Sequence, residues 1–375
     1  MRYYIIAGEA SGDLHGANLM RALREGDPQA EFRFWGGDSM AAIGGTPVRH
    51  IRDLAIMGFV EVVAHLGTVL GNINFCKHDI LAYQPGVVVG IDYPGFNLKI
   101  EAWAHKQGFK TVHYISPNLW AWKKGRIKGM RRNLDRLCYI LPFEEKFFAE
   151  NDMPQAVYVG HPLLDAINSS HSDTQPLGHT ATPIIALLPG SRRQELRESL
   201  PKMVQLATHH PEYQFVIAGM SLIGHEFYDN LIKKHSSKQS NNLEVVYDKT
   251  YPLLASAHAA VVCSGTATLE TALYDVPQVV CYSGNPISYL IARAVVGKRI
   301  KYISLVNLIA DRPVVTELIQ NDFNPERLEQ EFSLITTNEG NRQRMKEEYT
   351  TMRTLLGDGG ASQRTADTII QLIKQ

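Results

Sequence analysis

The sequence has 375 residues, room for two domains, since single domains usually have about 100 to 200 residues. Lysine and arginine total 38 and aspartate and glutamate total 38, so the formal charge is zero and the overall basic surface of a typical nucleic-acid-binding protein is excluded. Hydrophobic residues make up 45% and charged residues 20%, which excludes a disordered or fibrous chain. The four cysteines form no C-x-x-C pair, so a reducing, cytoplasmic compartment is expected.

Neither a signal peptide nor a membrane span is predicted. The apolar run at 3–7 is too short for the hydrophobic part of a signal peptide and predicts a first buried strand. The stretch 62–76 is nearly free of charge, but two glycines and two asparagines interrupt it before it reaches the roughly 18 apolar residues of a spanning helix.

Short β-branched runs alternate with segments of helical period through both halves of the chain, a pattern typical of parallel sheets covered by helices. The expected strands of the first half are 3–7, 32–35, 87–91, 111–115, 137–140 and 156–159. Those of the second half are 184–188, 215–218, 243–247, 259–263 and 278–281. From about residue 325 the composition favours helices alone.

The fold class is therefore α/β, with two doubly wound domains in tandem. We expect a first domain at 1–167, a Ser-, His-, Thr-, Gly- and Pro-rich linker at 168–183, a second domain at 184–350, and C-terminal helices at 351–375 that cross back onto the first domain. Ligands of such sheets bind beyond the carboxyl ends of the strands, so a cleft between the domains and the loops after strands are the expected site.

The loop after the first expected strand reads GEASGD, from Gly8 to Asp13. Its glycines allow close backbone approach, and Ser11 or Asp13 can cap the next helix. A capped turn without a ligand is the alternative reading. The loop is not G-x-G-x-x-G, so a dinucleotide site has little support.

Asp92 ends the hydrophobic run 87–91, where a carboxylate has apolar strands behind it and a cleft in front. These conditions raise the pKa of a carboxyl group toward that of a useful general base, and Asp92 is the leading catalytic candidate. A cap on the next helix is the alternative role for Asp92. Glu9, expected at the same edge, and Asp13 remain alternatives for the base.

A basic and aromatic segment follows the expected strand 111–115. It contains Ser116, Trp120 and Trp122, and then six positive charges in ten residues with no acid between them, beginning with Lys123 and including Arg126. This combination suits a phosphorylated ligand or anionic lipid headgroups, whereas a solvated helix face is the alternative.

The segment 56–83 is apolar with few charges, and includes Met57, Phe59 and Val62. It predicts either a core helix or, in a domain already supplied with apolar strands, a groove for an acyl chain or a surface that dips into a bilayer.

Two loops of the second domain predict a nucleotide diphosphate site. The first reads PGSR, in which the backbone at Gly190 and Ser191 can approach an anion and Arg192 can neutralise a leaving diphosphate; a hinge loop is the alternative. The second reads SGTATLE, in which Ser264 is expected to cap a helix, the amides at Gly265, Thr266 and Ala267 favour phosphate, and Glu270 lies one turn on, within reach of a ribose.

Several motifs are absent from the sequence: a Walker A loop, a G-x-S-x-G elbow, H-E-x-x-H, and a D-x-D pair. We therefore expect no metal and no cofactor, and expect the charge of a leaving diphosphate to be met by helix amides and arginine.

Seven strings taken together resemble lipid-A-disaccharide synthase, an inverting glycosyltransferase of lipopolysaccharide assembly in Gram-negative bacteria. They are GEASGD, MGFVEV, GIDYPGFN, HYISPNLWAW, LPFE, LPGSR and SGTATLE, in this order. The resemblance covers about residues 5 to 320. It implies the GT-B architecture, with acceptor lipid on the first Rossmann-like domain and sugar nucleotide on the second.

The resemblance also implies a reaction and residue roles. UDP-2,3-diacylglucosamine and 2,3-diacylglucosamine 1-phosphate would give a β-1,6-linked disaccharide 1-phosphate and UDP. Asp92 falls on the family's essential aspartate, Arg192 on its donor-site arginine, Glu270 on its ribose-side glutamate and Asn307 on an asparagine beside the nucleotide. Here Asn307 lies in Ser-Leu-Val-Asn where the family usually has Ser-Leu-Pro-Asn, which makes its backbone placement less certain.

The acceptor and membrane side is expected to involve Ser11 and Asn97 in addition to the aromatic, basic and apolar residues named above. Both substrates carry acyl chains, which implies a cytoplasmic enzyme attached peripherally to the anionic inner-membrane surface. Whether the C-terminal helices pack within one chain or exchange in a homodimer is left open.

Two other functions compete with this reading. An isomerase of the UDP-N-acetylglucosamine 2-epimerase type would share the nucleotide site but needs neither an acyl groove nor a membrane surface. A non-catalytic lipid or nucleotide carrier would leave Asp92 and the diphosphate site unexplained.

Overall fold

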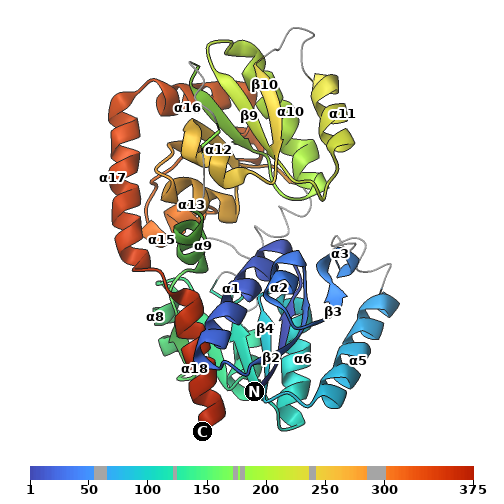
Figure 1. The fold of residues 1–375 in the computed structure, drawn as a ribbon. Helices are drawn as coiled ribbons and strands as arrows, with labels where there is room; N and C mark the ends of the chain where they lie inside the picture. The colour runs from blue at the N-terminus through green and yellow to red at the C-terminus, as the bar shows by residue number, and fades with distance from the viewer. Residues whose placement is uncertain (55–65, 121–124, 172–175, 178–181, 236–241, 285–300) are drawn as a thin grey trace. The chain divides into compact units, whose positions relative to one another are not determined.

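The computed structural model describes the chain except for residues 55–65, 121–124, 172–175, 178–181, 236–241 and 285–300. It divides into two compact units (Figure 1). Unit 1 consists of Met1–Ala166 and Asp358–Gln375, and unit 2 of Ile167–Gly357. Each unit is an α/β sandwich with its own parallel sheet, because each contains short buried runs separated by amphipathic helices.

Unit 1 is built on a seven-stranded sheet in the order β3-β2-β1-β4-β5-β6-β7. Its strands are β1 (Arg2–Ala7), β2 (Glu31–Gly36), β3 (Thr46–His50), β4 (Val87–Ile91), β5 (Lys110–Tyr114), β6 (Arg136–Tyr139) and β7 (Ala156–Tyr158). Its helices are α1 (Ala10–Gly26), α2 (Asp38–Ile43), α3 (Ile51–Leu54), α5 (Leu66–Tyr83), α6 (Pro94–Lys106), α7 (Arg126–Asn133), α8 (Glu144–Glu150), α9 (Pro162–His171), which continues into unit 2, and α18 (Ala361–Lys374).

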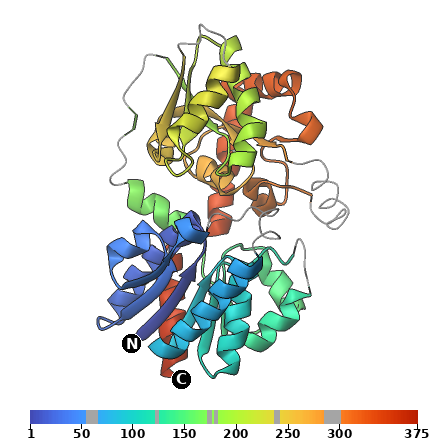
Figure 2. The same ribbon diagram turned by 90° about the vertical axis from the view of Figure 1, so that its right-hand side faces the viewer.

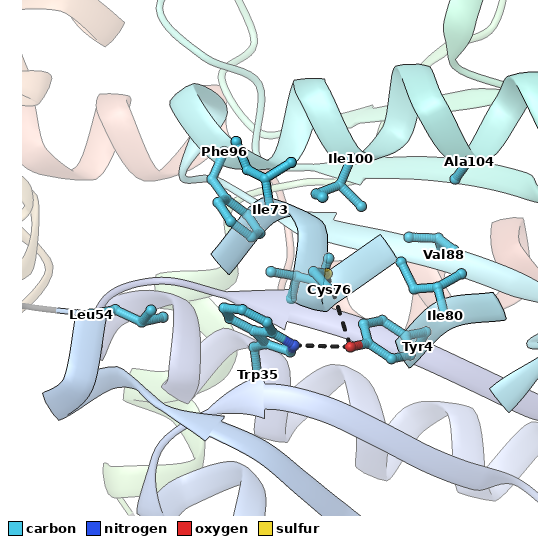
Figure 3. Close-up of a cluster of buried hydrophobic side chains, with 11 residues drawn as sticks. Tyr4, Trp35, Leu54, Ile73, Cys76, Ile80, Val88, Phe96, Ile100 and Ala104 are labelled. Atoms are coloured by element: carbon cyan, nitrogen blue, oxygen red, sulfur yellow. Dashed lines mark hydrogen bonds between the residues drawn. The ribbon is translucent and has the colours of Figure 1, made fainter. Parts of the chain in front are cut away.

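One face of this sheet is closed by α5 and α6. Figure 3 shows the hydrophobic cluster that these two helices form with the strands of the sheet. Within it, the Trp35 indole donates a hydrogen bond to the Tyr4 hydroxyl at 2.9 Å. The Tyr4 hydroxyl in turn donates to Asp79 of α5 at 2.8 Å, and Arg33 binds the same carboxylate. These buried polar contacts fix α5 on the sheet, because each buried donor and acceptor has its partner.

The opposite face is covered by α1 and α18, which pack together (Figure 1 and Figure 2). The first turn of α18 is held by Asp165 of α9, whose carboxylate accepts hydrogen bonds from the amides of Gly360, Ala361 and Ser362. A carboxylate at a helix N-terminus satisfies free amides and complements the helix dipole. The chain therefore returns to unit 1 at a defined docking point.

Unit 2 is built on a six-stranded sheet in the order β10-β9-β8-β11-β12-β13. Its strands are β8 (Ile184–Leu188), β9 (Gln214–Gly219), β10 (Leu243–Tyr247), β11 (Ala257–Cys263), β12 (Gln278–Tyr282) and β13 (Glu317–Ile319). Its helices are α10 (Arg193–His209), α11 (His225–His235), α12 (Thr250–Ser256), α13 (Thr266–Leu273), α15 (Leu305–Ala310), α16 (Pro325–Thr336) and α17 (Glu339–Leu356).

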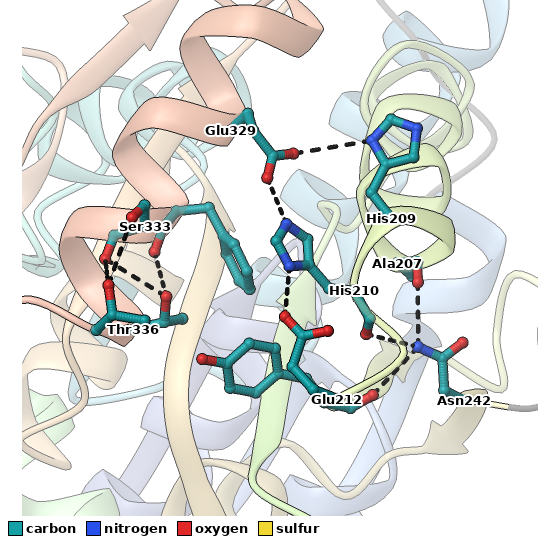
Figure 4. A network of polar contacts seen from close by, with 11 residues as sticks. Ala207, His209, His210, Glu212, Asn242, Glu329, Ser333 and Thr336 are labelled. Carbon is teal, nitrogen blue, oxygen red and sulfur yellow. Dashed lines mark hydrogen bonds and ion pairs between the residues drawn. The ribbon is translucent and has the colours of Figure 1, made fainter.

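A polar network ties α16 to the end of α10 (Figure 4). Glu329 of α16 binds His210 and lies 3.8 Å from the ring nitrogen of His209. The side-chain amide of Asn242 donates to the carbonyls of Ala207, His210 and Tyr213 at 3.0 to 3.1 Å. The loop after α10 is thus fixed by side chains rather than by regular backbone pairing.

Two expected boundaries are wrong. The division expected at 350/351 falls inside α17, and the chain leaves unit 2 only after Gly357, which has φ 74° and follows the end of that helix. The linker expected from 168 begins with the last residues of α9. Edge strands β3 and β13 were not predicted, because β3 contains a proline and is largely exposed and β13 has only three residues.

Within the part of the chain that the structure describes, none of the helices has both the length and the apolar character needed to cross a membrane.

Candidate functional site

The loops after β1, β4 and β5 emerge at one edge of the unit 1 sheet, because these strands are parallel neighbours. The structure thus brings Glu9, Asp92 and the start of the 115–120 loop to the same edge. The ring of Tyr93 lies directly over Gly8, where an added β-carbon would be 2.4 Å from a ring atom. Burial, and then the charge of Glu9, raise the pKa of Tyr93. Only a glycine allows this close approach of the two loops.

The backbone at Asp92 is strained. Asp92 and Tyr93 have φ values of 44° and 47°, and a non-glycine residue in this left-handed region costs about 1 to 3 kcal/mol. Asn97 compensates, since its side-chain amide donates to the carbonyls of Ile6, Ile91 and Asp92 at 3.2, 3.2 and 2.8 Å. A strained turn held by a buried side chain is typical of a site where one group must point in a fixed direction.

The role expected for Asn97 is therefore corrected. Asn97 is completely buried and bonded to backbone, so it holds the turn at Asp92 and does not face an acceptor or a membrane.

A buried ion pair lies beneath Asp92. His113 of β5 and Glu101 of α6 are 0% and 1% exposed, and Nδ1 of His113 is 2.7 Å from Oε1 of Glu101. Burial lowers the pKa of His113, but the charge and hydrogen bond of Glu101 and the charge of Asp92 outweigh it, so the net shift is upward. The charge coupling between His113 and Asp92 is mutual, because a positive charge on the imidazole and the negative charge of the carboxylate attract each other. The sequence analysis missed both residues.

Asp13 is excluded as a base. Its carboxylate accepts hydrogen bonds from the amides of Gly37, Ser39 and Met40 at 2.6, 2.9 and 3.1 Å, so it caps α2 rather than α1. Glu9 occupies the N-cap position of α1, where no side-chain cap bond forms, and Ser11 is exposed in the first turn. The expected cap of α1 by Ser11 or Asp13 is wrong.

The corner after β5 is also strained and closely packed. Ile115 has φ 71°, an outlier for a β-branched residue. Ser116 is 7% exposed and donates to the carbonyl of Pro117, so its hydroxyl is used locally instead of on an acceptor. Trp120 is half-buried and meets Phe143 edge to face at 5.1 Å, which places it against the core rather than on a lipid-facing surface. Both expected roles are corrected.

Glu144, the first residue of α8, closes this corner. It is 1% exposed, and its Oε2 accepts a hydrogen bond from the Leu141 amide at 3.2 Å. Burial raises the pKa of Glu144 to about 8, although backbone hydrogen bonds, first that of Leu141, act in the opposite direction. Glu144 ends the LPFE string, but the sequence analysis gave this residue no role, because its protonation depends on packing.

The remaining unit 1 candidates fall into two groups. Arg126 begins α7 and is half-buried. The other expected acceptor or membrane residues, Met57, Phe59, Val62, Trp122 and Lys123, lie outside the described residues.

In unit 2, the PGSR loop is closed on itself. Gly190 has φ 111°, and Oε2 of Glu195 accepts hydrogen bonds from the amides of Ser191 and Arg192 at 3.0 and 3.3 Å. Arg192 also contacts Oε1 of Glu195 at 3.2 Å, while its side chain is 67% exposed. The amides expected to meet a diphosphate are thus bound to a carboxylate, which an anion would have to replace.

The second diphosphate loop offers an uncapped helix. Gly265, not Ser264, is the N-cap of α13, and no side chain caps it. Ser264 instead donates to the carbonyl of Ile303 at 3.0 Å, which corrects its expected role. Thr266 is exposed and Ala267 half-buried in the first turn. The amides of this turn suit an anion by geometry and dipole.

Glu270 lies one turn further along α13. It is half-buried, accepts a hydrogen bond from the Tyr251 hydroxyl at 3.1 Å, and has its pKa raised by burial. Tyr251, which stacks on Tyr274, was not identified from the sequence. The pair leaves a carboxylate fixed in place for a hydroxyl-bearing ligand.

Asn307 is corrected most clearly. It is 1% exposed, its Oδ1 accepts from the amides of Val314 and Val315, and its Nδ2 donates to the Val315 carbonyl and to Glu317. All four hydrogen-bonding positions of the side chain are used, so none remains for a nucleotide. Asn307 holds a loop that the Ser264–Ile303 bond joins to the start of α13.

The described residues contain no group of three or more His, Cys, Asp or Glu side chains arranged to hold a metal ion.

The two parallel-sheet units and their loops define a class of protein, the GT-B fold shared by glycosyltransferases and certain epimerases. The sequence model of the Lipid-A-disaccharide synthetase family matches residues 3–373. The chain is 36% identical over 379 residues to the lipid-A-disaccharide synthase of Syntrophus aciditrophicus, covering 99% of this chain and 97% of that one. It is also 36% identical over 381 residues to that of Chromohalobacter salexigens, covering 100% and 97%. The chain belongs to the lipid-A-disaccharide synthase family and is a glycosyltransferase.

Solved structures agree on the fold. A glycotransferase of kitacinnamycin superposes with a TM-score of 0.64 at 14% identity, covering 99% of this chain and 98% of that one. UDP-GlcNAc 2-epimerase from Neisseria meningitidis superposes with a TM-score of 0.69 at 12% identity, covering 99% and 100%. At these identities the likeness concerns architecture alone, so the epimerase is a structural neighbour and not a relative in function.

Proposed function

We propose that this enzyme transfers 2,3-diacylglucosamine from UDP-2,3-diacylglucosamine to 2,3-diacylglucosamine 1-phosphate, forming the β-1,6-linked disaccharide 1-phosphate and UDP. The observation that carries the proposal is a family match over nearly the whole chain, together with a carboxylate at the strained turn after β4. Strain retained at one exact place, and compensated by Asn97, supports a working role for Asp92.

The acceptor side of the mechanism rests on Asp92. Its carboxylate accepts the proton of the acceptor 6-hydroxyl while that oxygen forms a bond to the anomeric carbon of the donor. The bond from that carbon to the diphosphate breaks on the opposite face, so the configuration inverts. The buried His113–Glu101 pair lies beneath Asp92 and is electrostatically coupled to it, and Asn97 keeps its turn in place.

The donor side rests on unit 2. Arg192 and the first-turn amides of α13 meet the negative charge that develops on the departing UDP. Glu270, oriented by Tyr251, accepts a hydrogen bond from the ribose. Because Glu195 occupies the amides of the PGSR loop, we assign the diphosphate chiefly to α13 and to the exposed Arg192 side chain. No metal or cofactor takes part in this proposal.

We also propose that the enzyme acts at the cytoplasmic face of the inner membrane as a peripheral protein. Three large apolar side chains on α5 support this, since Leu70, Phe75 and Leu81 are 53%, 42% and 39% exposed. Sedimentation with vesicles containing anionic lipid tests this attachment, and recovery of all the protein in the supernatant would contradict it.

The reaction is tested by UDP release from the donor, with and without the acceptor, in mild detergent and EDTA. Acceptor-dependent release with formation of a disaccharide is expected. Asp92→Asn should abolish turnover, whereas Glu9→Gln should retain most of it, because the two variants remove one carboxylate each from the same edge. The reverse order would make Glu9 the base, and conversion of UDP-N-acetylglucosamine to an epimer without transfer would refute the proposed function.

A further inference from the structure

A groove runs between α6 and α7 of unit 1. It encloses about 240 Å³ and is lined by Pro94, Leu98 and Glu101 of α6, by Arg126 and Met130 of α7, and by Leu134 after it. Pockets that hold a whole drug-sized ligand enclose about 300 to 1,000 Å³. The groove therefore matches one segment of a ligand, such as part of an acyl chain.

Two glycines line this groove. Gly95 of α6 and Gly129 of α7 both line it, and a β-carbon added at either would meet no heavy atom within 4 Å. Gly129 lies inside α7, where glycine is less stable than alanine by about 0.5 to 1 kcal/mol, and Gly95 is the second residue of α6. Open space beside these two backbones leaves room for a ligand between the helices.

The floor of the groove is formed by apolar side chains, and its edge carries two cationic side chains. Met130 and Leu134 are 2% and 4% exposed and belong to the hydrophobic cluster under α7, against which Leu98 packs. Lys99 is exposed and Arg126 half-buried, and both line the groove. An apolar floor beside two cations complements a ligand that joins a hydrocarbon chain to an anionic group.

A buried acceptor adds a third kind of contact. Glu101 lines the groove, and while its Oε1 is bonded to His113, its Oε2 is buried without a hydrogen-bond partner among the described residues. A buried carboxylate oxygen without a partner is costly unless a donor arrives with a ligand. Hydroxyl and amide groups on a sugar are such donors.

The groove also adjoins the proposed base. Pro94 follows Asp92 by two residues, and Glu101 is linked to Asp92 through His113, whose pKa both carboxylates raise. A ligand in the groove consequently lies beside the turn where the acceptor hydroxyl must lose its proton.

We propose that the α6–α7 groove binds the acceptor lipid, with an acyl chain between Gly95 and Gly129 and the 1-phosphate at Lys99 and Arg126. The inference rests on the proposed function and adds the place where the acceptor is held. It assigns this face to the acceptor rather than the donor, because the donor's anion is a diphosphate assigned to unit 2.

The test fills the groove without disturbing the fold. Gly129→Leu places a side chain in open space, and the substitution removes a helical glycine, so unit 1 should be at least as stable as before. We expect the KM for 2,3-diacylglucosamine 1-phosphate to rise about tenfold or more, since loss of a few buried methylenes has this effect. The KM for UDP-2,3-diacylglucosamine should not change.

Gly340→Leu is the matched control, because Gly340 is an exposed helical glycine in the first turn of α17 in unit 2. Lys99→Gln and Arg126→Gln test the phosphate contact, and each should raise the acceptor KM without altering the donor KM. An acceptor KM within about twofold of wild type in Gly129→Leu would overturn the acyl-chain assignment, since a blocked site should raise this KM about tenfold.

Failure of the proposed function gives a different result. If the wild-type protein shows no acceptor-dependent UDP release, the reaction is refuted and the groove is tested by direct binding of radiolabelled 2,3-diacylglucosamine 1-phosphate to the full chain. Binding that Gly129→Leu abolishes and Gly340→Leu preserves would support the groove, and binding equal in all three proteins would refute it.

Discussion

Replacing Glu144 by glutamine should lower the free energy of unfolding of unit 1 at about pH 5 and raise it at about pH 7.5. The folded protein holds this buried carboxyl in its neutral form because burial raises its pKa from 4.5 to about 8. The unfolded chain releases the proton near pH 4.5. A raised pKa means that the contribution to stability is complete below the unfolded value and is lost as pH rises toward the folded value.

The magnitude follows from this shift. Each pH unit above 4.5 lowers the free energy of unfolding by about 1.4 kcal/mol, which gives about 4 kcal/mol at about pH 7.5. Glutamine has no such proton to lose, but it brings an extra buried N–H group that costs about 1 to 3 kcal/mol if unpaired. We therefore expect Glu144→Gln to be about 2 kcal/mol more stable than wild type at about pH 7.5 and less stable by about 1 kcal/mol at about pH 5.

Urea unfolding followed by tryptophan fluorescence measures this change in unit 1 alone. All four tryptophans, at positions 35, 103, 120 and 122, lie in the Met1–Ala166 segment of that unit. Glu145→Gln is the control, because Glu145 is the exposed neighbour of Glu144. If the difference between Glu144→Gln and wild type is the same at both pH values, the carboxyl is not held neutral and the reasoning is wrong.

Burial lowers the pKa of His161 to about 3 and that of His15 to about 4. Below pH 6.5, each of these histidines should therefore lower the free energy of unfolding of unit 1 by about 1.4 kcal/mol per pH unit. His161→Asn should reduce this slope in urea titrations at acid pH. Asn97→Ala should cost unit 1 about 3 kcal/mol in urea unfolding and lower kcat more than it raises KM, because three carbonyls lose their donor. Glu195→Ala should lower the calorimetric Kd for UDP several-fold by releasing two amides.

Each of these has a matched comparison. Asn97→Asp keeps the shape of the side chain but cannot donate, so it should be as damaging as alanine; near wild-type kinetics would show that the amide does not hold the Asp92 turn. Glu198→Ala removes an exposed carboxylate from the same helix as Glu195 and should leave UDP affinity unchanged. An unaltered acid slope in His161→Asn would mean that this imidazole is not buried in its neutral form.

Sequence patterns predicted the two sheets well because a parallel strand covered on both faces reads as a continuous hydrophobic run. β4 and β8 are buried at every residue, and both were found from that signal. The same rule located Asp92, since it says where a loop after a central strand must emerge.

Patterns could not separate ligand-binding polar side chains from those that hold backbone. Asp13 in the first turns of α1 and Asn307 in α15 lie near the expected edges. Asp13 nevertheless binds backbone amides 24 to 27 residues along the chain, and Asn307 binds backbone groups and Glu317. Asn97 follows a predicted strand in the same way as a ligand-binding asparagine would, so its position in the sequence could not show that it binds backbone carbonyls. Glu144 and the Glu101–His113 pair were missed because the burial of a charged group depends on packing from several elements.

The return of Asp358–Gln375 to unit 1 determines the order in which the units can be completed during synthesis. Unit 2 is one continuous segment, whereas the α1 face of unit 1 lacks its covering helix and Asp165 lacks the three amides it binds until residues beyond 358 have left the ribosome. Domains usually fold in the order of their synthesis. Here the second unit can finish folding first. The apolar face of α1 stays uncovered while unit 2 is synthesised, and during this time a chaperone would have the most apolar surface to bind.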